Sequence, residues 1–129
     1  MYTHEYDRDY LYGPAMPVVE LRVRPIGVTG NGIGLQALVD SGADATILPI
    51  QILQDAGVEQ IGRARMRWGG HHSEMYNVYL ATLAIGDYTF HGVRVLAAAT
   101  SNEAILGRDV LNQLIVTLNG LAHVVELSQ

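Results

Sequence analysis

Cysteine is absent from the 129 residues, which excludes disulfide bonds, thiol nucleophiles and zinc–thiolate sites together. Lysine is absent too, so all 8 basic residues are arginines, set against 13 acidic residues for a net charge of −5. With no run of basic residues, the chain lacks the usual sequence signal for nucleic acid or an anionic membrane, and we expect neither partner. The missing cysteines leave the compartment open but suit a reducing one, and the cytoplasm is our expectation.

Long apolar runs are also missing, and none approaches the roughly 20 residues that a membrane-spanning helix needs. Residues 1–10 are polar and lack the apolar core of a signal peptide, so none is predicted. The length fits one domain. Residues 1–16 hold four tyrosines followed by Gly13 and Pro14, and we interpret this segment as an arm outside a domain of residues 17–129. The arm is either a poorly ordered tail or a contact to a partner.

Alternation of apolar and polar residues predicts a mostly β domain. Residues 19–23 alternate between apolar and charged side chains, the period of a half-buried strand. Short helices are expected at 49–56, between Pro49 and Gly57, and at 108–114. Turn signals such as Asn119-Gly120 separate the other strands. These strands are predicted at 33–39, 63–68, 74–85, 88–96, 115–117 and 124–127.

Two segments about sixty residues apart carry the candidate chemistry. Residues 37–49 read ALVDSGADATILP, and residues 104–112 read AILGRDVLN. The tripeptide Asp-Ser-Gly alone is also compatible with a turn that has no chemistry. Together and in this order, however, the two segments resemble the catalytic loop and the C-terminal Gly-Arg segment of retropepsin-like aspartic proteases.

The loop at Asp40 does not fit three other kinds of functional site. An EF-hand beginning at Asp40 needs glycine at Ala45 and glutamate at Gln51, so the loop does not fit calcium. Ser41 lacks the Gly-x-Ser-x-Gly context of a hydrolase nucleophile. A phosphatase-type Asp-x-Asp is absent because Asp40 and Asp44 are four residues apart.

The resemblance implies a closed retropepsin-like barrel with one or two short helices. It also implies an aspartic endopeptidase that acts on a peptide or protein without metal or cofactor. Only one Asp-Ser-Gly is present, and the chain is too short for the two-lobed pepsin architecture. Because the chemistry needs two carboxylates that share a proton, the resemblance implies a homodimer with one Asp40 from each subunit.

The resemblance also implies roles for individual residues. Asp40, Ser41 and Gly42 form the catalytic loop, with Gly42 allowing close backbone approach and Ser41 bonding across the dimer. Asp44 pairs with Arg108, a guanidinium–carboxylate contact that we expect to be buried. Ala43 and Asp44 are implied to contact the substrate. The residues implied to support the loop are Thr46, Gly107 and Arg108.

A flap over the substrate is implied between the two segments. The Gly-rich stretch 67–72 lies in this interval, and its residues Trp68, Gly69, Gly70 and His71 are candidates for substrate contact. An ordinary hairpin is the alternative. His71 and His72 are adjacent, so on a strand they point to opposite faces and rarely share a metal ion.

The resemblance covers about residues 17–127. The C-terminal end distinguishes between two groups of the family. Residues 114–119 look like the last strand of retroviral proteases, whose termini interleave in the dimer. Residues 120–127 continue as a predicted hairpin, which is more similar to the retropepsin-like domain of proteasome-shuttle proteins and bacterial homologues. The hairpin is therefore a candidate dimer interface. A second possibility is a catalytically silent dimerisation or peptide-binding module on the same fold.

Overall fold

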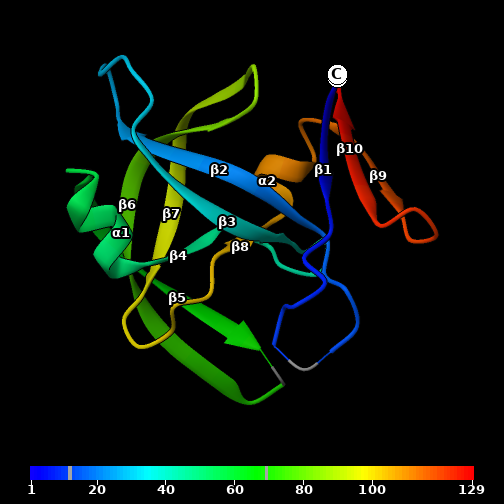
Figure 1. The fold of residues 1–129 in the computed structure, drawn as a ribbon. Helices are drawn as coiled ribbons and strands as arrows, with labels where there is room; N and C mark the ends of the chain where they lie inside the picture. The colour runs from blue at the N-terminus through cyan, green and yellow to red at the C-terminus, as the bar shows by residue number, and fades with distance from the viewer. Residues whose placement is uncertain (12, 69) are drawn as a thin grey trace.

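A computed structural model describes residues 1–11, 13–68 and 70–129, without the side chain of Trp68. Strands dominate the described chain, and two short helices interrupt them (Figure 1). In chain order the elements are β1 Tyr2–Glu5, β2 Val18–Pro25, β3 Ile33–Val39, β4 Ile47–Pro49, α1 Ile50–Asp55, β5 Glu59–Trp68, β6 His72–Ile85, β7 Tyr88–Ala98, β8 Ile105–Leu106, α2 Arg108–Leu111, β9 Ile115–Asn119 and β10 Val124–Ser128.

The larger sheet has seven strands in the order β2-β3-β8-β4-β7-β6-β5. An additional antiparallel pairing of β2 with β6 joins Arg22 to Ala84 and brings the sheet back on itself. The alternation predicted for β2 is present, because Leu21 and Val23 are fully buried while Glu20 is exposed. This alternation places one face of the sheet on a single hydrophobic core.

The helix α1 begins and ends as its sequence predicts. Pro49 precedes its first turn, and Gly57 follows with a φ of +72°, a left-handed conformation that glycine adopts without strain. Leu53 of α1 is fully buried and joins the core. Within the described part of the chain, no helix is long and apolar enough to cross a membrane.

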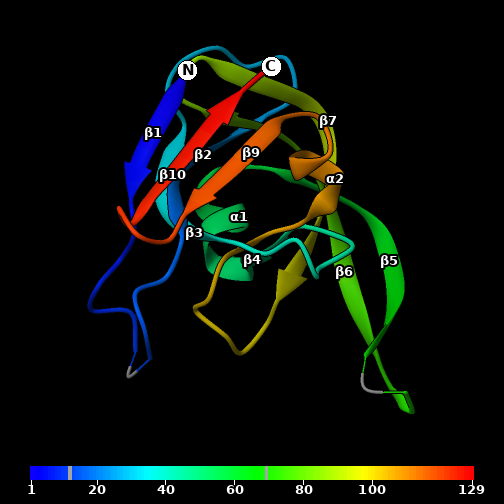
Figure 2. The same ribbon diagram turned by 90° about the vertical axis from the view of Figure 1, so that its right-hand side faces the viewer.

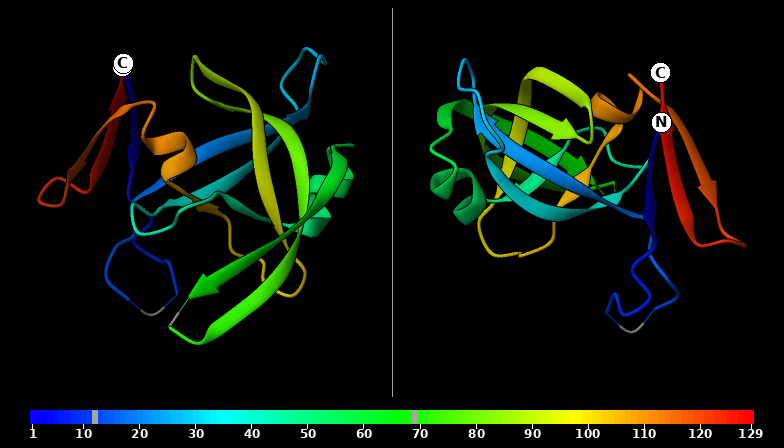
Figure 3. Two further views of the ribbon diagram at one scale, coloured as in Figure 1. Left: turned by 180° about the vertical axis from the view of Figure 1, so that it is seen from behind. Right: turned by 45° about the horizontal axis from the view of Figure 1, so that its top comes forward.

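A separate three-stranded sheet has the order β1-β10-β9, and both chain ends lie on it (Figures 2 and 3). The expectation that residues 1–16 lie outside the core is wrong for the first part of this segment. Tyr2 and Tyr6 pack against the core, and the Tyr2 hydroxyl accepts a 2.9 Å hydrogen bond from the backbone N–H of Glu20. The physical reason is that β10 leaves a free edge, whose backbone groups β1 satisfies.

The C-terminal elements differ slightly from their predicted bounds. Helix α2 ends at Leu111, three residues before the predicted end. The β9–β10 hairpin forms, but its turn is longer than Asn119-Gly120 because Asn119 pairs with Val124. The Asn119 side chain accepts a 3.0 Å hydrogen bond from the N–H of Ala122, which stabilises the longer turn.

Candidate active site

The fold brings the two motif segments side by side. Asp40 follows β3, and β3 pairs in parallel with β8, placing Leu38 opposite Ile105 and Val39 opposite Leu106. The N–H of Asp40 donates a 3.1 Å hydrogen bond to the carbonyl of Leu106. The position of Asp40 is therefore set by the second segment as well as by its own strand.

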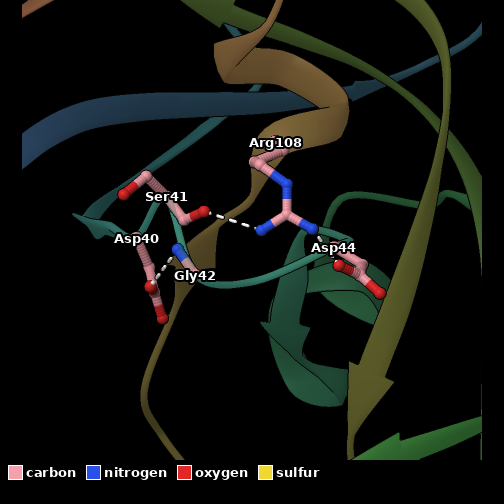
Figure 4. A network of polar contacts seen from close by, with 5 residues as sticks. All are labelled: Asp40, Ser41, Gly42, Asp44 and Arg108. Carbon is pink, nitrogen blue, oxygen red and sulfur yellow. Dashed lines mark hydrogen bonds and ion pairs between the residues drawn. The ribbon is translucent and has the colours of Figure 1, made fainter.

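The carboxylate of Asp40 is held by its own loop (Figure 4). The Oδ1 atom of Asp40 accepts a 2.9 Å hydrogen bond from the N–H of Gly42. The backbone carbonyl of Asp40 accepts one of 3.2 Å from the N–H of Ala43. A Cβ at Gly42 would lie 3.2 Å from Oδ1 of Asp40, which is a tight contact, so glycine gives the carboxylate room. Asp40 is half-buried, and Ser41 and Gly42 are exposed.

Arg108 extends from α2 and bridges two points of the loop (Figure 4). Its guanidinium forms an ion pair with Asp44 and donates a 2.7 Å hydrogen bond to the carbonyl of Ser41. The predicted pair is thus present, but the expectation that it is buried is wrong. The side chains of Arg108 and Asp44 are 40% and 73% exposed, because the loop lies at the surface of the single chain.

An Arg108→Ala variant is expected to lose only about 1 kcal/mol of unfolding free energy, because water screens an exposed pair and replaces its hydrogen bonds. Urea denaturation measures this loss. Arg8→Ala is the matched control, since Arg8 is also exposed. A loss of about 3–5 kcal/mol for Arg108→Ala alone is typical of a buried pair and would contradict this expectation.

A second, partly buried link between the segments joins Thr46 and Gly107, which were predicted to support the loop, to Asp109, which was not predicted. Both oxygens of Asp109 accept hydrogen bonds from Thr46, at 3.0 Å from its N–H and 2.8 Å from its hydroxyl. The Thr46 hydroxyl oxygen in turn accepts a 3.1 Å hydrogen bond from the N–H of Gly107. Thr46 is completely buried, so this chain of bonds fixes the end of the catalytic loop against the start of α2.

A cavity of about 400 Å³ opens over Asp40. Ala43 and Asp44, two of the residues predicted to contact substrate, line it. The described residues Gly70 and His71 are not among its lining residues, while Gly69 and the Trp68 side chain lie outside the described part. The complete lining is Asp40, Gly42, Ala43, Asp44, Ala45, Ile47, Met66, Arg67, Tyr76, Ala98, Ser101, Glu103 and Ile105.

Sequence reasoning missed several residues of this cavity. Met66 and Tyr76 reach it from the β5–β6 hairpin, and Glu103 reaches it from the loop before β8. Burial raises the pKa of the Tyr76 hydroxyl, with further contributions from the charge of Glu74 and a hydrogen bond to it. Alternation along β5 and β6 was a usable signal for the first two residues, because every second side chain of a hairpin shares one face.

The described residues of the cavity form no cluster of metal ligands. Among the residues that the structure describes, no three histidine, aspartate or glutamate side chains gather around a common point. The groups that meet at Asp40 are a carboxylate, loop N–H groups and apolar walls. These groups suit general acid–base chemistry on a bound substrate.

Comparison with known families decides the family of this chain. The model of the family described as "gag-polyprotein putative aspartyl protease" matches residues 26–113, more than half of the sequence. The chain belongs to this family. The match includes both motif segments, and this aspartyl protease family is the one that the sequence resemblance predicts. No curated protein matches the chain.

Solved structures show the same fold as this aspartyl protease family member. A retropepsin-like aspartic protease from Rickettsia conorii is similar with a TM-score of 0.68 and 15% identity, over 98% of this chain and 88% of that one. EIAV protease complexed with the inhibitor HBY-793 has a TM-score of 0.61 and 19% identity, over 81% and 90%. At these identities the likeness shows the retropepsin-like fold alone.

Proposed function

We propose that the protein is an aspartic endopeptidase whose active site combines Asp40 from two subunits. The observation that carries this proposal is the half-buried Asp40 carboxylate, fixed by its loop and open to a cavity of about 400 Å³. Membership in the aspartyl protease family supports it. Cleavage of a peptide library from acidic to neutral pH, read by mass spectrometry, tests it.

The proposed reaction needs one charged and one neutral carboxylate. Two Asp40 side chains that face each other cannot both ionise cheaply, so they share a proton. The charged Asp40 takes a proton from a water molecule while the oxygen of that water attacks the scissile carbonyl carbon. The neutral Asp40 donates its proton to the carbonyl oxygen. As the C–N bond breaks, the Asp40 that took the proton from water gives it to the leaving nitrogen. The other Asp40 takes back a hydroxyl proton from the tetrahedral intermediate, which becomes a carboxylic acid, and the shared-proton state is restored.

We propose the β9–β10 hairpin as the contact between subunits. Strand β9 is an edge of the three-stranded sheet, and its Ile115 and Leu118 are 60% and 49% exposed. Leu121 in the adjoining turn is fully exposed. An exposed strand edge with apolar side chains is suited to pairing with a second copy of itself. The pairing of β2 with β6 also supports a closed barrel in each subunit.

A Leu118→Asp variant is expected to be monomeric and inactive, because each dimer would bury two carboxylates at the proposed interface. Sedimentation velocity gives the mass, and peptide cleavage gives the activity. Ile26→Asp is the control, since Ile26 is 46% exposed on the loop that follows β2, a strand of the seven-stranded sheet. A Leu118→Asp variant that remains dimeric and active would remove β9 from the interface.

The β5–β6 hairpin is proposed as the flap. Trp68 pairs with His72 in its ladder, so the predicted hairpin is present, and Gly70 in the turn has a φ of +73°. Met66 and Arg67 of β5 line the cavity. Closure of this hairpin over an extended peptide would exclude water from the two Asp40 carboxylates.

A further inference from the structure

Glu103 places a carboxylate in the wall of the Asp40 cavity. It lies in the loop between β7 and β8, directly before the second motif segment, and it is half-buried. Its backbone N–H donates a 3.0 Å hydrogen bond to the Ser101 side chain, which shapes the loop. The position of Glu103 is therefore built into the loop that also leads to β8.

The N-terminal loop reaches this carboxylate. Tyr10, between β1 and β2, donates a hydrogen bond to Glu103. Burial and then this hydrogen bond and the charge of Glu103 raise the pKa of Tyr10 to about 12, with a smaller effect from Asp7. A tyrosine hydroxyl is protonated at neutral pH even at its ordinary pKa of 10.0, so the Tyr10 hydroxyl remains a donor.

The base of the N-terminal loop is fixed. Asp7 and Met16 exchange two backbone hydrogen bonds of 2.8 Å, and the side chain of Gln36 donates one of 2.8 Å to the Asp7 carboxylate. Gln36 belongs to β3, the strand that leads to Asp40. In Figures 1 and 2 this loop, the loop before β8 and the β5–β6 hairpin project at the same end of the molecule. The loop can thus hold Tyr10 in place beside Glu103.

Among the described residues, Glu103 forms no ion pair. Asp44 is paired with Arg108, and Asp40 is assigned to the chemistry. Arg67 also lines the cavity, but in the described part of the chain the ion pairs are Arg108–Asp44 and Arg22–Glu20. A carboxylate has about four acceptor sites, so the Tyr10 hydroxyl leaves Glu103 free to accept further hydrogen bonds.

The cavity that Glu103 lines also offers apolar contacts. Ile47, Ala98 and Ile105 line the same cavity and are buried or half-buried. Arginine and lysine side chains combine an apolar stem with a cationic end that donates several hydrogen bonds. Their chemistry therefore matches a wall that is apolar and carries an acceptor. The net charge of −5 also favours basic peptides at long range.

We propose that Glu103 is a specificity-determining residue that binds an arginine or lysine side chain of the peptide substrate, and that Tyr10 is a positioning residue for Glu103. This inference rests on the proposed function, because the peptide is the substrate of the Asp40 site. It adds the class of substrate, namely peptides with a basic residue near the scissile bond.

A peptide library with matched arginine, lysine, methionine and glutamine at each position around the cleaved bond tests the proposal. The wild type is expected to favour a basic residue at one position by about tenfold or more in kcat/KM, the size of one charge-assisted hydrogen bond. Glu103→Gln is expected to remove this preference, so that the ratio of kcat/KM between the arginine and methionine peptides falls about tenfold or more relative to the wild type. Glu59→Gln, which alters an exposed carboxylate outside the cavity, is the control.

Tyr10→Phe separates positioning from folding. It is expected to reduce the ratio of kcat/KM between basic and methionine peptides, with the change mainly in the KM of the basic peptides. A loss of stability alone would affect all peptides equally. A wild type that shows no preference for basic residues, or a Glu103→Gln variant that keeps the preference, would overturn the proposal.

Two further measurements distinguish the remaining outcomes. If Glu103 instead pairs with Arg67 when the hairpin closes, Glu103→Gln and Arg67→Gln will slow cleavage of all peptides alike, which also overturns the proposal. If the wild type cleaves nothing, the proposed function fails, and calorimetry with an arginine peptide and its glutamine analogue still tests the site. Tighter binding of the arginine peptide, lost in Glu103→Gln, supports the site without catalysis, and equal binding rejects it.

Discussion

An Asp40→Asn variant is expected to lose peptide cleavage by at least about 10³-fold, because an amide can neither take a proton from water nor give one to the scissile carbonyl. The fold and the dimer are expected to be unchanged. Asparagine has the same shape, and its amide oxygen can still accept the hydrogen bond from the N–H of Gly42. The loss is therefore chemical and not structural.

Cleavage of the peptide library measures this effect, with circular dichroism and sedimentation velocity on the same preparation. Asp87→Asn is the matched control, because Asp87 is an exposed turn residue between β6 and β7 and does not line the cavity. Cleavage by Asp40→Asn at the wild-type rate would reject the aspartic mechanism. A folded and dimeric wild type that cleaves no peptide would instead favour a binding module on the same fold.

A Gly107→Ala variant is expected to be destabilised by about 3 kcal/mol, the upper end for an inserted methyl group that forces backbone to move. A Cβ at Gly107 would lie 2.6 Å from the carbonyl carbon and oxygen of Ala45 and 3.0 Å from the carbonyl oxygen of Ala43. All three atoms are backbone atoms of the catalytic loop, so no side chain can rotate away. The movement would also disturb the hydrogen bond from Gly107 to the Thr46 hydroxyl.

Urea denaturation measures this change, and cleavage is expected to fall as well, because the shifted loop carries Asp40. Gly120→Ala is the matched control. Gly120 lies in the exposed β9–β10 turn, an added Cβ there meets no atom within 4 Å, and its φ is not positive. Its effect is expected within about 0.5 kcal/mol. An equally small effect for Gly107→Ala would show that the loop and α2 are not closely packed.

Local patterns predicted the features that depend on residues close in the sequence. The bounds of β3 and the span of α1 follow from alternation and from Pro49 and Gly57, so the structure confirms them. The two motif segments predicted the family, and the match over residues 26–113 confirms it. The pairing of Arg108 with Asp44 came from the resemblance and is present. The roles of these residues in catalysis stay predictions.

Contacts between distant segments were not predictable in the same way. Thr46 and Asp109 are 63 residues apart, and Tyr10 and Glu103 are further apart still, so no local period relates them. The use of residues 2–5 as a strand depends on the free edge that β10 presents. The exposure of the Arg108–Asp44 pair likewise depends on which elements cover the loop.

The sequence by itself determined the longer strands β2, β3, β6 and β7, the short helix α1 and the loop that carries Asp40, because side-chain periodicity and backbone preferences of proline and glycine act locally. Only the tertiary structure decided that β3 lies beside β8, that Asp109 fixes Thr46, and that Glu103 lines the cavity over Asp40. The physical reason is that strand pairing and burial join residues far apart in the chain. Such contacts form only once the whole sheet has folded around its core.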